Sequence, residues 1–366
     1  MLTNGRHAAE PRPPARASGA DLVRVGIVGL GRAGWNIHAK TLARMTDRFR
    51  ITAIMDPDAG QRAEAETILG CRAVDTFEAL LDESIDLVVV ASPSHLHADQ
   101  SIAAMRTGRH VVCEKPFGLS ADDAEQMIEI AHDAGVVLAP FQNRRYEANY
   151  RKVREIIDSG ALGEILQIRL CWHRFSRRWD WQALKRFGGG ALFNNGTHLL
   201  DQAMAMLGDA EPELFLDLRR GLSLGDADEH LKLVLREPGG PTIDIEYTNA
   251  SAFEHDRWHI MGTHGGLRGT QTELEWRVAD WSRMPERELE LGPARDRKYP
   301  TDEVVWIERR WAEPAEEPHP YELLYADVHG AIRRGSELGV TPESALRCLR
   351  VLDRCAALMP SEPAGA

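Results

Sequence analysis

The stretch VGIVGLGRAG, residues 25–34, decides the fold of the first part of the chain. An apolar run leads directly into the pattern G-x-G-x-x-G, and a helix-like segment follows. The first glycine permits a tight turn, the second admits a pyrophosphate close to the backbone, and the third lets helix and strand pack together. The helix would also present free N–H groups to phosphates. The stretch therefore predicts a dinucleotide site made of Gly29, Gly31, Arg32, Ala33 and Gly34.

An acidic residue stands at the end of the second expected strand, where such a fold binds a ribose. Asp56 lies 22 residues after Gly34. A carboxylate there accepts hydrogen bonds from both ribose hydroxyls of NAD and repels the 2′-phosphate of NADP. Alternatively, Asp56 only caps the helix that follows. The nearby Arg62 could also weaken the preference for NAD over NADP. The sequence favours the ribose role, and NAD over NADP.

The order of apolar runs predicts two domains. Strands and helices alternate over residues 21–142, which is typical of a parallel, doubly wound α/β sheet. Over residues 143–366, strand-like runs follow one another with few helices between them, which indicates an α/β domain with a largely antiparallel sheet. Residues 1–20 are expected to form a disordered tail.

Several single elements are also expected from the pattern. A helix should follow the glycine loop over residues 34–45, and another should span residues 191–207. Two helices should close the chain, over residues 321–337 and 342–358. The stretch 283–320 is rich in proline and charge, so an irregular insertion is expected there.

The composition excludes several classes of partner. The 366 residues carry a formal net charge of −12, and the isoelectric point is near 5.6. Because an acidic chain repels phosphate backbones, nucleic acid and anionic membranes are poor partners. No apolar run approaches the roughly 18 residues needed to cross a bilayer, and residues 1–20 lack the apolar stretch of a signal peptide. We expect a cytoplasmic protein.

The cysteines agree with that expectation. There are five, an odd number, and no two of them have C-x-x-C spacing. This usage argues for a reducing compartment and against a disulfide framework or a zinc site. We expect no bound metal. The cysteines are Cys71, Cys113, Cys171, Cys348 and Cys355.

Two further motifs follow the glycine loop along the chain. The first is Glu114-Lys115-Pro116, and the second is GGGALFNNGTHLLD, residues 188–201. In this order the three motifs resemble the Gfo/Idh/MocA family of oxidoreductases, named for glucose–fructose oxidoreductase and inositol dehydrogenase. The resemblance covers residues 22–358. It implies a Rossmann domain followed by an open-faced sheet domain, with the substrate between them over the nicotinamide.

The resemblance also implies roles for single residues. Lys115 would contact the reacting hydroxyl, His198 would act as acid and base, and the Lys115–Pro116 bond is often cis in the family. The counterpart of residues 142–146 lies near the nicotinamide. A turn at the carboxyl end of a strand usually approaches the cofactor, although His97 there is alternatively a packing residue. The further residues expected at the cofactor are Ser92, Pro93, Ser94, His97, Glu114, Lys115 and Asn143.

The chemistry of alcohol oxidation asks for the same two side chains. A hydride leaves a carbinol carbon only as the hydroxyl proton is taken, and an imidazole can take and return that proton near neutral pH. An ammonium beside the oxygen stabilises the developing alkoxide. On a regular helix, Asn194, His198 and Asp201 lie at i, i+4 and i+7 and share one face. Alternatively, that face is polar and solvated, although the glycine run before it permits close approach to another body.

One residue departs from the pattern of the family. Most polyol dehydrogenases of the family carry Asp where this chain has Asn194. The amide still donates and accepts hydrogen bonds, so we expect Asn194 in the catalytic group. The change leaves the acid/base role with His198, and it weakens inositol as the expected substrate.

The substrate side is expected to be basic and aromatic. Residues 173–181 read HRFSRRWDW, and in the family this region overhangs the site. Aromatic faces stack on sugar C–H surfaces, and guanidinium groups bind hydroxyls or carboxylates, so the arginines hint at an anionic sugar. Alternatively, the stretch is a solvated basic loop. The expected substrate residues are Lys115, Arg145, Arg177, Arg178, Trp179, Asn194, His198 and Asp201.

Three functions remain open. The first is an NAD-dependent dehydrogenase that moves a hydride between the nicotinamide and a secondary hydroxyl of a sugar, sugar acid or polyol. The second is a redox-neutral enzyme that keeps its NAD and cleaves or epimerises a glycoside. The third is a non-catalytic nucleotide-binding regulator. A homodimer or homotetramer through the C-terminal sheet is also expected, because bare apolar sheet surface is unfavourable in water.

Overall fold

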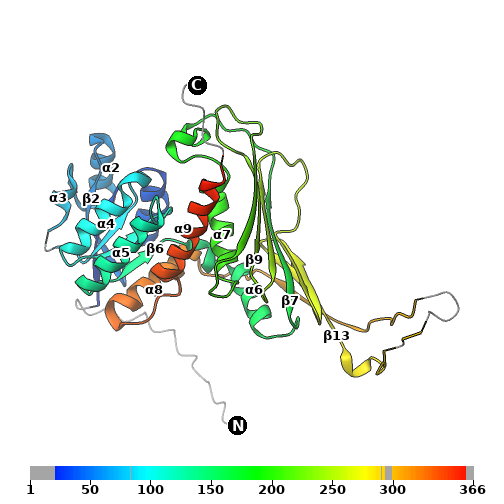
Figure 1. Cartoon of the computed structure of the whole chain (residues 1–366). Helices are drawn as coiled ribbons and strands as arrows, with labels where there is room; N and C mark the ends of the chain where they lie inside the picture. The colour runs from blue at the N-terminus through cyan, green and yellow to red at the C-terminus, as the bar shows by residue number, and fades with distance from the viewer. Residues whose placement is uncertain (1–20, 83, 290, 293–298, 360–366) are drawn as a thin grey trace, which may run out of the picture.

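A computed structural model describes residues 21–82, 84–289, 291–292 and 299–359, so the tail expected over residues 1–20 lies outside the described residues. One sheet lies at each end of the described molecule, and helices α7 and α9 lie between the two sheets (Figure 1). The chain alternates strands and helices up to Pro140 and is mostly strands from there to Ala312. The two sheets expected from the sequence are therefore confirmed.

The first sheet is parallel throughout. Its described strands lie in the order β3-β2-β1-β4-β5-β6, which is the order of a Rossmann fold. The strands are β1 (Val23–Val28), β2 (Phe49–Met55), β3 (Arg72–Val74), β4 (Leu87–Val90), β5 (His110–Cys113) and β6 (Leu138–Pro140). The helical segments are η1 (Gly34–Ala39), α1 (Lys40–Leu42), α2 (Ala59–Leu69), α3 (Phe77–Leu80), η2 (Ser94–Leu96), α4 (His97–Arg106) and α5 (Ala121–Ala134).

Local sequence explains these elements well. All four residues of β4, Leu-Val-Val-Val, are buried, as expected of a strand covered on both faces. Helix α5 begins with a capping box between Ser120 and Asp123 and ends at Gly135 in the left-handed conformation. The helix expected over residues 34–45 is shorter and begins as a π-helical turn, η1, in which His38 is buried.

The second sheet is antiparallel except between β7 and β10. Its described strands lie in the order β14-β13-β12-β11-β7-β10-β9-β8. They are β7 (Ile165–His173), β8 (Glu213–Arg219), β9 (His230–Arg236), β10 (Thr242–Thr248), β11 (Trp258–Gly262), β12 (Gly265–Gly269), β13 (Glu273–Ala279) and β14 (Trp306–Ala312). The helical segments are η3 (Asn143–Tyr146), α6 (Ala148–Asp158), η4 (Trp181–Ala183), η5 (Lys185–Phe187), η6 (Leu192–Gly196), α7 (Thr197–Met204), η7 (Trp281–Arg283), α8 (Pro320–Arg334) and α9 (Pro342–Ala357).

The irregular insertion expected over residues 283–320 is wrong in part. Strand β14 lies inside it and pairs antiparallel with β13 along its whole length. Its sequence, WIERRWA, has no apolar alternation. The edge strand was missed because its side chains are not buried: six of its seven residues are exposed, and only Trp311 is partly buried.

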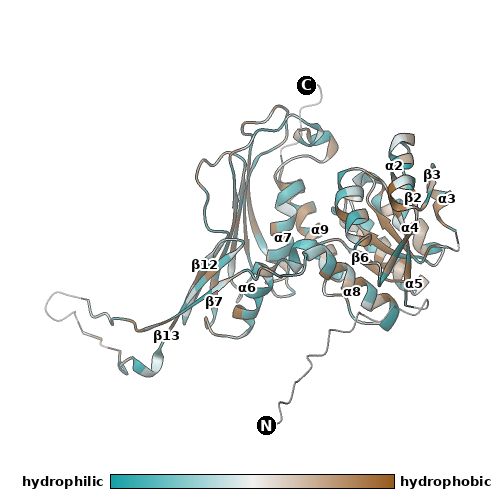
Figure 2. Ribbon diagram, turned by 180° about the vertical axis from the view of Figure 1, so that it is seen from behind, coloured by the Kyte–Doolittle hydropathy of each residue, from teal (hydrophilic) through white to brown (hydrophobic). Residues whose placement is uncertain are grey.

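The two faces of the second sheet differ. Helices α6, α7 and α9 lie on the side facing the Rossmann domain (Figure 2), and buried residues such as Leu233 of β9 and Leu199 of α7 share one core. The other face carries a ladder of ion pairs between neighbouring strands. The pairs are Arg169–Asp244, Lys232–Asp244, Lys232–Glu246, Arg268–Glu275 and Arg277–Glu308. This face therefore carries ion pairs as well as exposed apolar side chains such as Phe215 and Met261, and the oligomer expected through it stays a prediction.

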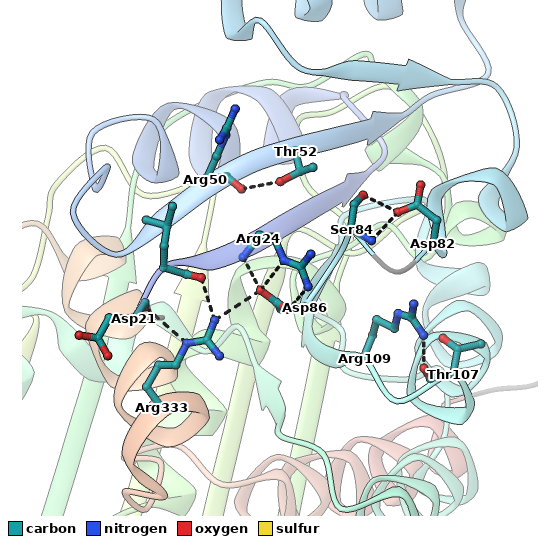
Figure 3. A network of polar contacts seen from close by, with 11 residues as sticks. Asp21, Arg24, Arg50, Thr52, Asp82, Ser84, Asp86, Thr107, Arg109 and Arg333 are labelled. Carbon is teal, nitrogen blue, oxygen red and sulfur yellow. Dashed lines mark hydrogen bonds and ion pairs between the residues drawn. The ribbon is translucent and has the colours of Figure 1, made fainter. Parts of the chain in front are cut away.

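Helix α8 returns to the Rossmann domain, although the sequence assigned all of residues 143–366 to the second domain. Tyr325 and Val328 of α8 belong to the buried cluster that contains β1. Arg333 donates to the carbonyl of Leu22 and reaches the carboxylate of Asp86, which also binds Arg24 (Figure 3). The boundary at residue 142 thus separates the two sheets, but one helix beyond it completes the first domain.

Candidate functional site

The glycine loop has the geometry that the sequence predicts. Gly29 has φ +86°, which favours glycine. A Cβ on Gly34 would lie 1.8 Å from the Gly29 oxygen, so this position needs close packing of helix and strand. A Cβ on Gly31 would meet nothing within 4 Å. The loop therefore leaves open space at the one glycine beside which a pyrophosphate is expected to lie, and its residues fit a dinucleotide.

Asp56 lies against the same loop. Its carboxylate accepts hydrogen bonds from the backbone N–H of Leu30, at 2.7 Å, and of Asp58, at 2.9 Å. The side chain that caps helix α2 is Asp58, which accepts from the N–H of Gln61. Arg62 donates to the backbone carbonyls of Asp56 and the next residue. The alternative that Asp56 caps the helix is wrong, and its place beside the glycine loop supports a cofactor role.

The turn after β4 is built around His97. This histidine is buried, and its two ring nitrogens lie 2.9 Å from the Ser92 oxygen and 2.8 Å from the Pro116 oxygen. Both ring nitrogens are thus engaged by backbone carbonyls, so His97 joins two loops of the Rossmann domain and has no ring nitrogen left for a cofactor. Pro93 and Ser94 open the short helix η2.

Glu114 forms the buried centre of a polar chain that the sequence did not predict. One carboxylate oxygen accepts from the N–H of Lys115 at 2.8 Å, and the other lies 3.2 Å from Nε2 of His38. Nδ1 of His38 lies 2.7 Å from the hydroxyl of Tyr325 in α8. Burial raises the pKa of Glu114, but the hydrogen bond and charge of His38, together with the charge of Lys115, outweigh it and lower that pKa. Glu114 is therefore an ionised support of the loop.

Lys115 joins the two domains. Its bond to Pro116 is cis, as the resemblance implies. Its Nζ donates to the side-chain oxygen of Asn194 at 3.1 Å and to the backbone oxygen of the same residue at 3.3 Å. Burial lowers the pKa of Lys115, Glu114 opposes this, and the charges of Arg32, Arg144 and Arg178 lower it further. The ammonium thus sits in a strongly positive environment.

His198 lies in the same group. It is buried in α7, and its Nδ1 has no hydrogen-bond partner. Burial holds its pKa well below the usual 6.5, and the charge of Lys115 is the next largest cause. The imidazole is therefore neutral at pH 7, and it lies four residues after Asn194, the residue that Lys115 contacts.

The expectation that Asn194, His198 and Asp201 share one ligand-facing side is wrong for Asp201. Residues 192–196 form a π-helical turn before α7, and the N–H of Gly196 donates to the oxygen of Ala191, five residues earlier. This π turn precedes α7, so it affects only the alignment of Asn194 with the later residues, whereas His198 and Asp201 lie three residues apart within the regular helix α7. Asp201 is instead buried, and both its oxygens accept from Arg145, at 2.6 and 2.7 Å.

The same contacts correct the expectation for Arg145. Its guanidinium is paired with Asp201 inside the second domain, next to Cys348, whose Sγ lies 3.6 Å from the Asp201 carboxylate. The two residues tie the segment after β6 to α7. They are therefore structural, and neither is free to bind a substrate.

The residues of the basic loop lie in two different environments. Arg178 lines a cavity of about 20 Å³ with Asn194, and its guanidinium is paired with Asp180. Trp179 is 77% exposed, and Arg177 is exposed as well. The structure brings Arg178 to the Lys115 group and leaves Arg177 and Trp179 at the surface. Asn143 begins η3.

The glycine run before Asn194 packs closely against the second domain. A Cβ on Gly189 would lie 2.2 Å from the Gln182 oxygen, and a Cβ on Gly190 would lie 2.6 Å from the Asp228 carboxylate. Asp228 in turn accepts from the N–H of Leu192. The close approach expected of the glycines is therefore made to the chain itself, and it fixes the start of the segment that carries Asn194.

Among the described residues, no group of three or more His, Cys, Asp or Glu side chains is placed to hold a metal ion. Within the same ranges, no helix is both long and apolar enough to span a bilayer. All five cysteines are buried and free.

Comparison with known proteins agrees with this geometry. Residues 23–142 match the model of an oxidoreductase family with an NAD-binding Rossmann fold, and residues 150–268 match the GFO/IDH/MocA C-terminal domain. The chain is 31% identical over 258 residues to the myo-inositol 2-dehydrogenase of Thermotoga maritima. The aligned region covers 67% of this chain and 74% of that protein.

Two other similarities bear on function and fold. The chain is 29% identical over 256 residues to the 2,7-anhydro-N-acetylneuraminate hydratase of Escherichia coli, covering 68% of this chain and 67% of that protein. The structure of a putative oxidoreductase from Bacillus subtilis superposes with a TM-score of 0.76 at 20% identity, covering 93% of this chain and 96% of that one. The last similarity concerns the fold alone.

Proposed function

Because the chain belongs to the Gfo/Idh/MocA family of NAD-binding oxidoreductases, we propose that it transfers a hydride between NAD and a secondary hydroxyl of a sugar, sugar acid or polyol. The observation that carries the proposal is the contact of Lys115, from the Rossmann domain, with Asn194 of the second domain, four residues before His198. The inositol dehydrogenase relative supports a polyol-like substrate.

The first domain would hold the cofactor. Bound NAD supplies the group that accepts or returns the hydride. The open space at Gly31 suits the pyrophosphate, with the Arg32 guanidinium nearby, and Asp56 beside the loop suits the ribose hydroxyls. The turn of Ser92 to Ser94 and the segment at Asn143 would border the rest of the cofactor.

The two titratable groups divide the work of proton transfer. His198 is neutral at pH 7 because its pKa is held well below 6.5, so it would accept the hydroxyl proton during oxidation and return it during reduction. Lys115 would donate a hydrogen bond to the same oxygen and stabilise its developing charge. Asn194 would orient Lys115 through the 3.1 Å contact with its Nζ.

The test is a panel of polyols, aldoses, sugar acids and glycosides mixed with NAD or NADP, followed at the absorbance band of the reduced nicotinamide. We expect at least one compound to reduce NAD, and faster than NADP. The variants Lys115→Ala and His198→Ala should lower that rate roughly 10²–10⁴-fold, with unchanged melting temperature and NAD affinity. Full activity in both variants would reject these roles.

A redox-neutral reaction is the second candidate, and the hydratase relative favours it. Transient oxidation of a sugar hydroxyl would acidify the neighbouring C–H, and elimination or epimerisation could follow before the hydride returns. The same Lys115 and His198 would serve both reactions. Product formation with no net change in added NAD, on the same panel, would support this candidate over the dehydrogenase. A non-catalytic regulator would instead show neither outcome.

We also propose that the protein forms a homodimer or homotetramer through the second sheet. The inter-strand ion pairs on its open face would then be an interface of charged groups. The mass in solution, measured by light scattering, tests this proposal, and a monomer at all concentrations would reject it.

A further inference from the structure

Two arginines whose charges act on His198 share one tryptophan ring. The Cζ of Arg144, in η3, lies 4.3 Å from the centroid of the Trp172 ring. The Cζ of Arg257, the residue before β11, lies 5.2 Å from the same centroid. Guanidinium groups bind aromatic faces well, so the ring holds both cations in place. Sequence reasoning singled out neither arginine as a ligand group of its own.

Arg257 is the unusual member of this group. It is only 4% exposed, and its Nη2 donates to Oε1 of Gln202 at 3.1 Å. Its Nε and Nη1 are buried and have no hydrogen-bond partner. In the part of the chain that the structure describes, no carboxylate lies within ion-pair distance of it. Burial lowers the pKa of Arg257 to about 10; the charge of Glu147 opposes this effect, and the charge of Arg144 adds to it.

A buried cation without an anion is costly, because it has lost its water and gained no opposite charge. Proteins keep such groups mainly at functional sites. The cost would fall if an anion from outside the chain completed the site, so the unused donors of Arg257 indicate a missing ligand group.

The arginines belong to the same site as His198. Gln202, which binds Arg257, lies one turn after His198 in α7, and its Nε2 donates to the backbone oxygen of Arg144 at 2.8 Å. The charges of both arginines act on His198. The Nδ1 of His198 lacks a partner as well. Two buried groups with unused hydrogen-bonding atoms, His198 and Arg257, are therefore associated with this one turn of α7.

The balance of charge in the cleft points the same way. Three of its cations have a carboxylate beside them. Arg178 pairs with Asp180, Arg144 pairs with Glu147, and Lys115 lies beside Glu114. Arg32 stands in the glycine loop, where a pyrophosphate would meet it. Glu147 is the anion near both Arg144 and Arg257, so one positive charge of these two arginines remains without a counterion.

We propose that the substrate carries a carboxylate, bound by Arg144 with Arg257 behind it, next to the hydroxyl that His198 serves. The side chain of Arg144 is 22% exposed, so a ligand can contact Arg144 more easily than the buried Arg257. A guanidinium binds a carboxylate through two parallel hydrogen bonds. One uncompensated charge matches a carboxylate better than a dianionic phosphate. This substrate class rests on the proposed function, which it narrows from sugars and polyols in general to sugar acids.

A purely structural role makes a different prediction. Arg257 would then link the sheet to α7 through Trp172 and Gln202, and its loss would destabilise the fold. If it is kept for a ligand, Arg257→Met should leave the melting temperature of the free protein unchanged or higher, because a hydrophobic replacement removes an unpaired buried charge.

The experiment measures binding to the NADH-loaded protein by calorimetry and thermal shift. The probes are matched pairs, D-glucuronate against D-glucose and D-galacturonate against D-galactose, with glucose 6-phosphate as a dianionic comparison. The variants are Arg257→Met, Arg144→Gln and, as a matched control that removes one exposed charge from α4, Arg106→Gln. Binding is followed separately from turnover with NAD.

We expect at least one acid to bind about tenfold or more tightly than its neutral partner, and Arg257→Met and Arg144→Gln to weaken the acid about tenfold or more without affecting the neutral sugar. Arg106→Gln should change neither. Acid binding that depends on Arg257 without any turnover would keep the site and reject the proposed function. Turnover of neutral sugars alone would keep the function and overturn the carboxylate. Tighter binding of the phosphate, or an Arg257→Met variant that is strongly destabilised with unchanged acid preference, would also overturn it.

Discussion

The two sides of the cleft differ in how their polar groups are satisfied. On the cofactor side, both ring nitrogens of His97 contact backbone carbonyls, and both oxygens of Glu114 contact a donor. On the substrate side, Nδ1 of His198 and two nitrogens of Arg257 have no partner. His97 and Glu114 on the cofactor side are therefore held by the chain itself, whereas His198 and Arg257 on the substrate side keep hydrogen-bonding atoms that a ligand can use.

This difference sorts residues by the kind of damage their loss should cause. A side chain whose bonds are all made within the protein should affect stability first. A side chain with unused donors should affect binding and rate first. Polar residues that lie close together in sequence, such as His198 and Asp201, fall on opposite sides of this division.

The largest expected effect tests that division inside α7. Asp201→Leu would leave Arg145 charged, buried and unpaired, which should lower the free energy of unfolding by about 3–5 kcal/mol. The double variant Arg145→Met with Asp201→Leu should recover most of the loss. Urea unfolding of both measures this, and kcat of the folded protein should stay near that of the wild type. A double variant as unstable as the single one would show that the pair is not the reason for the loss.

The next effect compares two glycines of one loop. Gly34→Ala would place a Cβ 1.8 Å from the Gly29 oxygen, so we expect a loss of about 3 kcal/mol or more in the free energy of unfolding. Gly31→Ala meets no protein atom within 4 Å. It should keep the melting temperature and lower NAD affinity about tenfold or more by filling the space for the pyrophosphate.

Calorimetry with NAD and thermal unfolding separate the two outcomes. A Gly31→Ala protein that binds NAD as tightly as the wild type would contradict the place given to the pyrophosphate. A Gly34→Ala protein of normal stability would contradict the packing described for the loop.

A smaller effect concerns the pH dependence of oxidation. Activity should need neutral His198 and charged Lys115, so the acid limb should lie well below pH 6.5 and the alkaline limb below pH 10.5, because both pKa values are lowered. Asn194→Asp would place a carboxylate, with its negative charge, beside the Nζ of Lys115. A negative charge favours the protonated form of each group, so both pKa values should rise.

Both limbs of the rate profile should therefore move to higher pH in Asn194→Asp. Asn36→Asp, which adds the same charge at an exposed position beside Lys40, is the matched control and should leave the profile unchanged. If the limbs of the rate profile stay in place in Asn194→Asp, or move to lower pH, Asn194 does not lie close to Lys115 and His198.

The sequence predicted the cofactor side better than the substrate side. The roles of Gly29 and Gly34 are local, since a turn and a close packing are properties of neighbouring residues, and the strand alternation gave the parallel sheet. The ligand-facing role assumed for Asp201 was wrong because Arg145, 56 residues earlier in the chain, binds both of its carboxylate oxygens, and no local signal indicates that pair. Strand β14 failed because an exposed edge strand has little apolar alternation.

Residues brought together over long distances were the hardest to predict. His38 stands four positions after Gly34, on the packing side of a helix, and this was the only local signal for its burial. Nothing around Tyr325 indicates that α8 returns to the Rossmann domain. Arg257 precedes an apolar strand, and its lack of a partner becomes visible only when Trp172 and Gln202 are in place.

The smallest effect tests the polar chain behind Lys115. Tyr325→Phe would remove the hydroxyl 2.7 Å from Nδ1 of His38 and leave that nitrogen without a partner in a buried place. We expect a loss of about 1–2 kcal/mol in the free energy of unfolding and little change in KM for NAD. Because Glu114 still contacts Lys115 and His38 in this variant, kcat should fall less than in Lys115→Ala. A kcat as low as that of Lys115→Ala with unchanged stability would show that these polar residues take part in proton transfer. Their role would then not be limited to supporting the loop of Lys115.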